Sequence, residues 1–134
     1  MKAIVESAQA PYWGLPVRGL EQPTLQLGPD ACAVMMPAEL GEKIAAAIKT
    51  EGLRGPVIRH LRTGRWTFIT EGWQEGDTAP MWLFNWHAMV INNGTLPLPR
   101  ADDAFRAWIH LPSNEIRPRV QDVVARIQRI GGER

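Results

Sequence analysis

Three arginines and a tryptophan near the middle of the chain have types and spacing suited to binding a charged ligand. Arg59, Arg62, Arg65 and Trp66 lie close together in the stretch 55–70. Guanidinium groups hold phosphates, and an indole ring can stack on a base. The alternative is a solvated turn whose arginines only cover part of a sheet. The chain's net charge of +1 favours this alternative, because nucleic-acid-binding domains are usually more basic. These residues are therefore candidate nucleic-acid or nucleotide contacts.

The element that must position them is a β-hairpin. Val57–Leu61 and Trp66–Thr70 are rich in residues that favour strands, and they flank a polar tip. Gly64 can adopt the positive φ that a tight tip requires. We therefore expect the arginines at the solvent-facing end of a hairpin whose arms are apolar.

The three histidines, His60, His87 and His110, are the next candidates. Each falls in or beside a predicted strand, and no spacing between them matches a metal-binding motif. The polar segment Glu71–Pro80 is long enough to be either an active loop or an ordinary surface loop. One open hypothesis is therefore a small histidine-dependent enzyme with this loop over its pocket.

Other reactive side chains have simpler interpretations. Cys32 lies within an apolar run, where burial raises the thiol pKa and makes the group inert. Asp102 and Asp103 are adjacent, so on an extended chain they would point in opposite directions, which favours a role in a turn over one in metal binding. We find no P-loop or dinucleotide fingerprint. No catalytic residue, metal site or cofactor is predicted.

The chain has six tryptophans, many for 134 residues. Buried packing is the ordinary explanation for large aromatic side chains. Aromatic residues are also enriched at protein interfaces. Trp73, Trp82 and Trp86 are accordingly candidate interface residues, which leaves open a homo-oligomer or a partner-binding module.

The first half of the chain predicts a buried strand followed by a helix. Ala31–Met36 is wholly apolar and short, as in a buried strand. Pro37 can open a helix because its missing N–H costs nothing there. Leu40, Ile44 and Ile48 then recur at helical spacing.

The second half predicts more strands and a final helix. Asn92-Asn93-Gly94 fits the tight turn of a second hairpin, between a strand ending at Ile91 and a return arm from Thr95. Phe105–Leu111 alternates like a half-buried strand, and an apolar stripe from Val120 onward predicts a helix opened by Pro118. Together these elements predict an α+β fold with a mainly antiparallel sheet of about five strands and two helices on one face.

Length and composition predict one domain. We expect residues 1–30 to form an extended arm packed on a single α+β domain at 31–134. No signal peptide or membrane-spanning run is visible, and a lone cysteine allows no internal disulfide. The expected location is the cytoplasm, without a membrane partner.

Several spaced short pieces of the chain resemble a family of small actinobacterial proteins, the bifunctional DNA primase/polymerase N-terminal-like group. The similar region covers about residues 28–125. The pieces are Gly28–Val34, Pro37–Gly41, Gly55–Val57, Arg65–Phe68, Gly94–Pro99 and Arg106–Ile109. The resemblance implies an α+β domain related to primase-polymerase folds. It transfers no catalytic residue, because no acidic metal-binding motif aligns. What it implies is a non-catalytic domain that binds single-stranded nucleic acid or a nucleotide, or that has become a protein-interaction module.

Overall fold

The computed structural model describes residues 12–19, 21–113 and 116–131. In chain order its elements are β1 (Val17–Arg18), β2 (Thr24–Leu27), β3 (Ala31–Met36), α2 (Ala38–Thr50), β4 (Val57–His60), β5 (Trp66–Glu71), the 3₁₀ helix η2 (Met81–Trp86), β6 (Met89–Ile91), β7 (Gly94–Pro97), β8 (Arg106–His110) and α3 (Val120–Gly131).

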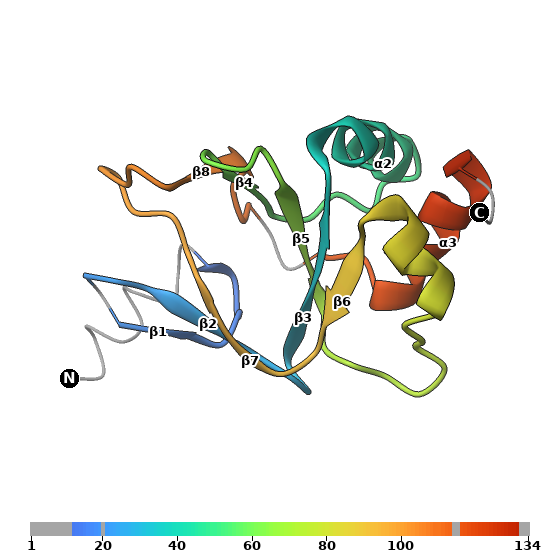
Figure 1. Cartoon of the computed structure of the whole chain (residues 1–134). Coiled ribbons are helices and arrows are strands. Elements are labelled where there is room, and N and C mark those ends of the chain that lie inside the picture. The colour runs from blue at the N-terminus through green and yellow to red at the C-terminus, as the bar shows by residue number, and fades with distance from the viewer. Residues whose placement is uncertain (1–11, 20, 114–115, 132–134) are drawn as a thin grey trace.

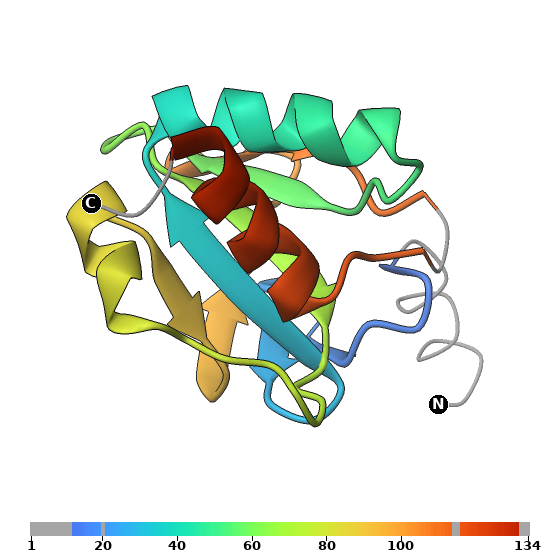
Figure 2. The ribbon, with the colours of Figure 1, turned by 90° about the vertical axis from the view of Figure 1, so that its right-hand side faces the viewer.

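A five-stranded antiparallel sheet forms the centre of the molecule, in the order β6-β3-β5-β4-β8. Helices α2 and α3 cover one of its faces (Figures 1 and 2). This arrangement confirms the predicted α+β class, with a mainly antiparallel sheet and two helices on one face.

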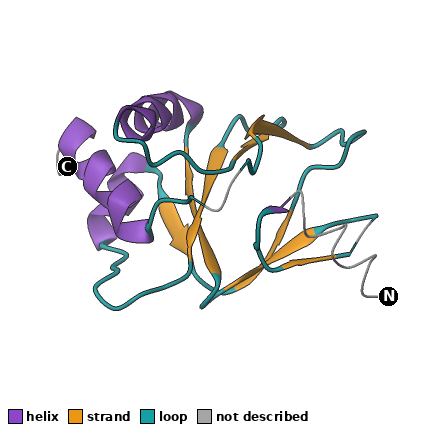
Figure 3. Cartoon of the chain, turned by 180° about the vertical axis from the view of Figure 1, so that it is seen from behind, coloured by secondary structure: helices purple, strands orange, loops and turns teal. Residues whose placement is uncertain are grey.

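The other face of this sheet is covered by a second, three-stranded sheet, in the order β1-β2-β7 (Figure 3). Leu25 and Leu27 of β2 pack with Ala33 and Ile69 of the large sheet in a separate apolar cluster. The sequence patterns did not predict this layer. Within the expected N-terminal arm, β1 and β2 are thus integral strands; residues 1–11 and 20 lie outside the described part.

The two sheets share one bent ribbon. Strand β2 leads into β3 through residues 28–30, while their partners β7 and β6 are joined at 92–93. Since β6 pairs only with β3 and β7 only with β2, the predicted Asn92–Gly94 hairpin is wrong. The turn residues instead bend the chain from one sheet into the other. Gly94 lies in this bend with a positive φ of +85°.

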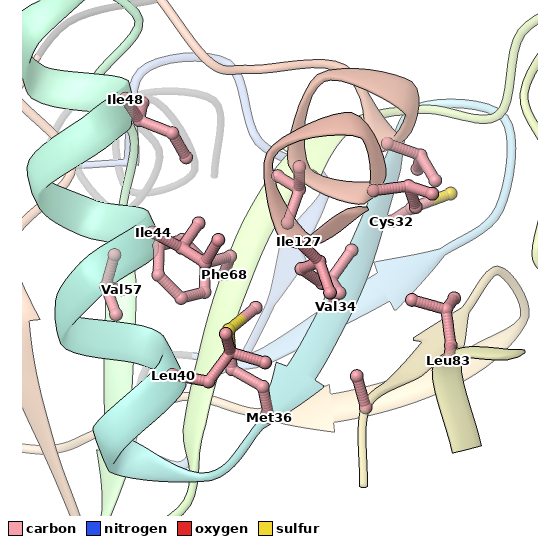
Figure 4. Packing of buried hydrophobic residues seen from close by; sticks show 14 residues of the cluster. Cys32, Val34, Met36, Leu40, Ile44, Ile48, Val57, Phe68, Leu83 and Ile127 are labelled. Atoms are coloured by element: carbon pink, nitrogen blue, oxygen red, sulfur yellow. The ribbon is translucent and has the colours of Figure 1, made fainter. Parts of the chain in front are cut away.

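The main core lies between the large sheet and the helices. Val34, Met36 and Phe68 meet Ile44 of α2 and Ile127 of α3 (Figure 4). A Cβ on Gly41 would approach the Trp66 ring to 2.8 Å, so only glycine lets α2 lie this close to the sheet.

Within the described part of the chain, no helix is long and apolar enough to span a bilayer.

Candidate functional site

The β4–β5 hairpin has the predicted form. Ile58 pairs with Thr67 and Arg59 with Trp66. At the tip the His60 N–H donates to the Arg65 carbonyl over 2.8 Å, and Gly64 adopts a φ of +75°. Residues 61–65 therefore project as a short loop beyond the ladder, between β4 and β5 (Figure 1).

The three arginines of this hairpin differ in how they are held. Arg59 and Arg62 are exposed, and neither forms an ion pair or side-chain hydrogen bond among the residues the structure describes. Arg65 is half-buried, and its Nη2 donates to the His87 carbonyl over 2.6 Å. No acid among the described residues pairs with Arg65, and a carbonyl oxygen carries no formal charge, so that hydrogen bond does not neutralise it. The structure thus leaves all three charges available at one end of the hairpin.

Trp66 has a different environment from the one a stacking surface requires. Its indole ring packs against Gly41 of α2, and its centroid lies 6.4 Å from that of Phe68. The side chain is only partly exposed and joins the helix-side core. The structure therefore places Trp66 beneath the arginines as an anchor of the hairpin.

A charged turn lies beside the tip, where the Leu61 N–H donates to the Phe105 carbonyl over 2.9 Å. In this turn Asp103 accepts backbone N–H bonds from Phe105 at 2.7 Å and Arg106 at 3.1 Å, and pairs with the Arg106 side chain at 3.5 Å. The Phe105 N–H contributes most to lowering the pKa of the Asp103 carboxyl. As predicted, Asp103 is a turn residue. Its carboxylate is engaged by hydrogen bonds and an ion pair within its own turn.

His60 adjoins the cluster without adding charge to it. Its Nε2 lies 2.8 Å from the Thr67 hydroxyl oxygen, and the residue pairs with Arg106 of β8. Burial lowers the pKa of His60, and the charges of Arg106 and Arg65 lower it further. The ring is therefore neutral near pH 7, so phosphate contact here falls to the arginines.

The structure does not gather the histidines into one site. His60 and His110 lie at opposite ends of the β4–β8 ladder, and His87 ends η2 with a left-handed φ of 55°. The loop after β5 is held against α3 by Asp77–Arg119 at 3.1 Å and Thr78–Gln121 at 3.1 Å. Among the described residues, no three His, Cys, Asp or Glu side chains are grouped as metal ligands would be.

Cys32 is fully buried, as the sequence predicted. Burial raises the pKa of its thiol, and the nearby Asp77 carboxylate raises it further. A thiol so held is a poor nucleophile.

The candidate interface tryptophans lie in two places. Trp82 and Trp86 are partly buried against the helix-side core, and Trp73 is 36% exposed. The most exposed apolar side chains near them are Met81, at 78%, and Phe84, at 57%, both on η2. Sequence reasoning missed these two, because nothing in the stretch 81–86 says which side of η2 faces the core.

No family model, curated protein or solved structure matches the chain.

Proposed function

We propose that this chain is a primase-polymerase-like domain that binds single-stranded nucleic acid without acting on it, through phosphate contacts from the β4–β5 hairpin. The observation that carries the proposal is the state of Arg59 and Arg62: both are exposed and neither is paired with an acid among the described residues. Folding gains little from such side chains, whereas a phosphate backbone gains a charge-assisted contact from each.

Two groups next to Arg59 and Arg62 also favour phosphate binding. Arg65 is fixed by the His87 carbonyl, which lowers the entropy its guanidinium would lose on binding. Asp103, in the turn that the tip contacts through Leu61 and Phe105, is already bonded within that turn. The phosphates would thus meet arginines without competition from Asp103.

Base stacking is not part of the proposal, because Trp66 packs against α2. Binding by phosphate contact alone is sequence-independent and sensitive to salt. We therefore expect weak binding to single strands of any sequence, and weaker binding to a mononucleotide, which offers fewer separated phosphates.

Fluorescence anisotropy with a labelled oligothymidine at low salt tests the proposal. Arg62→Ala should weaken binding about tenfold, since one charge-assisted contact contributes roughly 1.5 kcal/mol. Arg129→Ala is the matched control, because it also removes an exposed arginine but on α3. Equal affinities of the two variants, or no binding by the parent chain, would overturn the proposal. A deoxynucleoside triphosphate competing at the oligonucleotide's own affinity would identify a nucleotide site instead.

A second candidate function is protein docking through η2, including self-association. The specific observation favouring it is the exposure of Met81 and Phe84 beside the partly buried Trp82 and Trp86. Light scattering of the parent chain and of Met81→Ser/Phe84→Ser tests it. A concentration-dependent oligomer that the double variant loses would support docking of a second copy of the chain. A parent chain that stays monomeric at every concentration would exclude self-association through η2.

A further inference from the structure

A cleft lies at the far end of β4 from the arginine-tipped loop. One of its walls is Arg54-Gly55-Pro56, which leads into β4, and the other is formed by the end of β8, Trp108–Leu111. Next to this cleft the pairing of β4 with β8 has a register shift between Val57 and Ile58, where Val57 pairs with His110 and Ile58 with Trp108. The opening, which we call the β8 cleft, has a volume of about 400 Å³. Small-molecule sites commonly start at about 300 Å³.

The polar groups of the β8 cleft carry positive charge. Arg54 and His110 line it together with the Ser113 side chain. Among the described residues that line the cleft there is no carboxylate; Glu115, between Ser113 and Ile116 in the sequence, lies outside the described residues. Glu51, three residues before Arg54, pairs with Arg126 and Arg129 of α3. Arg54 itself is exposed and forms no ion pair within the described residues. Within the described part of the chain, the cleft therefore has a cation on its rim that no carboxylate pairs with.

The pKa of His110 reflects the positive charges at this end of the cleft. Burial lowers the pKa of His110, and the positive charges of Arg54 and of Lys49, at the end of α2, lower it further. Among the described residues, those two cations are the charged groups that act on the His110 ring. An anion placed between Arg54 and His110 would relieve their repulsion and raise the His110 pKa again.

The remaining lining is apolar. Trp108, Ile109, Leu111 and Ile116 surround the charged end, and Leu111 is 65% exposed. Inorganic phosphate would leave this surface unfilled, and a neutral apolar compound would leave Arg54 unpaired. A pocket with apolar walls and a few convergent polar groups is typical of small-molecule sites.

We propose that the β8 cleft binds a small organic anion, with its carboxylate or phosphate between Arg54 and His110 and its apolar body against the walls around Trp108. A guanidinium can hold either head group through two parallel hydrogen bonds. The site is separate from the phosphate-binding hairpin and is independent of the nucleic-acid proposal.

Four probes separate the parts of this proposal: phenylacetate, phenyl phosphate, inorganic phosphate and 2-phenylethanol. We follow Trp and His resonances by NMR during titration of the full chain. Phenylacetate, phenyl phosphate or both should bind at least tenfold more tightly than the last two probes, and the stronger of the two identifies the head group. The proposal is overturned if 2-phenylethanol binds as well as either aromatic anion, or if no probe shifts these resonances up to its solubility limit.

Two variants test the assigned residues. Arg54→Ala should weaken binding of the aromatic anion about tenfold or more, which is the loss of one charge-assisted pair. Arg18→Ala removes an exposed arginine from β1 and should not change it. In the parent chain affinity should rise as the pH falls toward the His110 pKa, because protonated His110 adds a second donor and charge. His110→Gln should remove that rise. Equal binding by Arg54→Ala and Arg18→Ala would contradict the proposal.

Discussion

Arginines play opposite parts in the β4–β5 hairpin and in α3. On α3 and just before it, Arg119 pairs with Asp77 at 3.1 Å, Arg126 pairs with Glu51 and Asp122, and Arg129 pairs with Glu51 at 3.2 Å. On the hairpin, Arg59 and Arg62 meet no acid among the described residues. The same side chain joins elements in one region and faces solvent in the other.

This difference separates stability from binding. Arginines paired with buried or partly buried acids hold α3 to the loop after β5 and to the residue after α2, so losing these arginines should lower the free energy of unfolding. Arginines without a partner contribute little to folding and remain free to bind an outside anion. Changes in the two regions should therefore affect different measurements.

The largest effect should come from Arg119→Met. The Asp77 carboxylate is fully buried and would keep only the Gln74 N–H, at 2.8 Å. Losing one partner of a buried pair costs 3–5 kcal/mol, and the 39% exposure of the Arg119 side chain reduces this to about 2 kcal/mol. Urea unfolding measures the loss. Adding Asp77→Asn should recover part of it, and a loss below about 0.5 kcal/mol would contradict the structural role.

A smaller effect is expected from Arg126→Met. The Arg126 side chain is 12% exposed, but Glu51 and Asp122 are 34% and 32% exposed and would regain water. We expect a loss of about 1 kcal/mol. The nucleic-acid affinity of the folded protein should not change, and anisotropy on the same sample checks this. A tenfold loss of that affinity would place α3 in the binding surface.

The double variant Arg59→Ala/Arg62→Ala should barely change stability. Exposed side chains without partners usually contribute less than about 0.5 kcal/mol. Urea unfolding of this variant beside the parent chain measures the difference. A loss near 2 kcal/mol would mean that these arginines also serve the fold, and the contrast with α3 would fail.

The smallest expected effect is a pH dependence of stability from His60. Its pKa is lower in the folded chain than the ordinary value of about 6.5, so the unfolded chain binds more protons as the pH falls below that value. Stability is therefore full above about pH 6.5 and declines toward the folded pKa. The stability of His60→Gln should decline less than that of the parent chain between about pH 7 and about pH 5 in urea unfolding. An unchanged decline in His60→Gln would contradict this account.

Local patterns predicted the elements whose evidence is local. Alternation and Gly64 predicted the β4–β5 hairpin, and apolar spacing predicted β3, α2 and α3. The prediction of a hairpin at Asn92–Gly94 was wrong, because turn chemistry does not say which strand each arm will pair with. The second sheet was missed for the same reason, since β2 and β7 are far apart in the sequence.

The candidate sites show the same limit. The sequence alone placed Arg62 in a hairpin tip with Arg59 close to it, but only packing reveals that Gly41 brings α2 onto Trp66. The pairing of β4 with β8 brings Arg54 and His110 to the same cleft, and no sequence spacing indicates that they lie near each other.

The salt dependence of oligothymidine binding tests the central claim most directly. Three phosphate contacts on a single strand predict that log affinity falls with log salt concentration at a slope of about −2, and Arg59→Ala/Arg62→Ala should reduce this to about −0.7. Equal slopes for the parent chain and the double variant would show that the hairpin arginines do not contact phosphate.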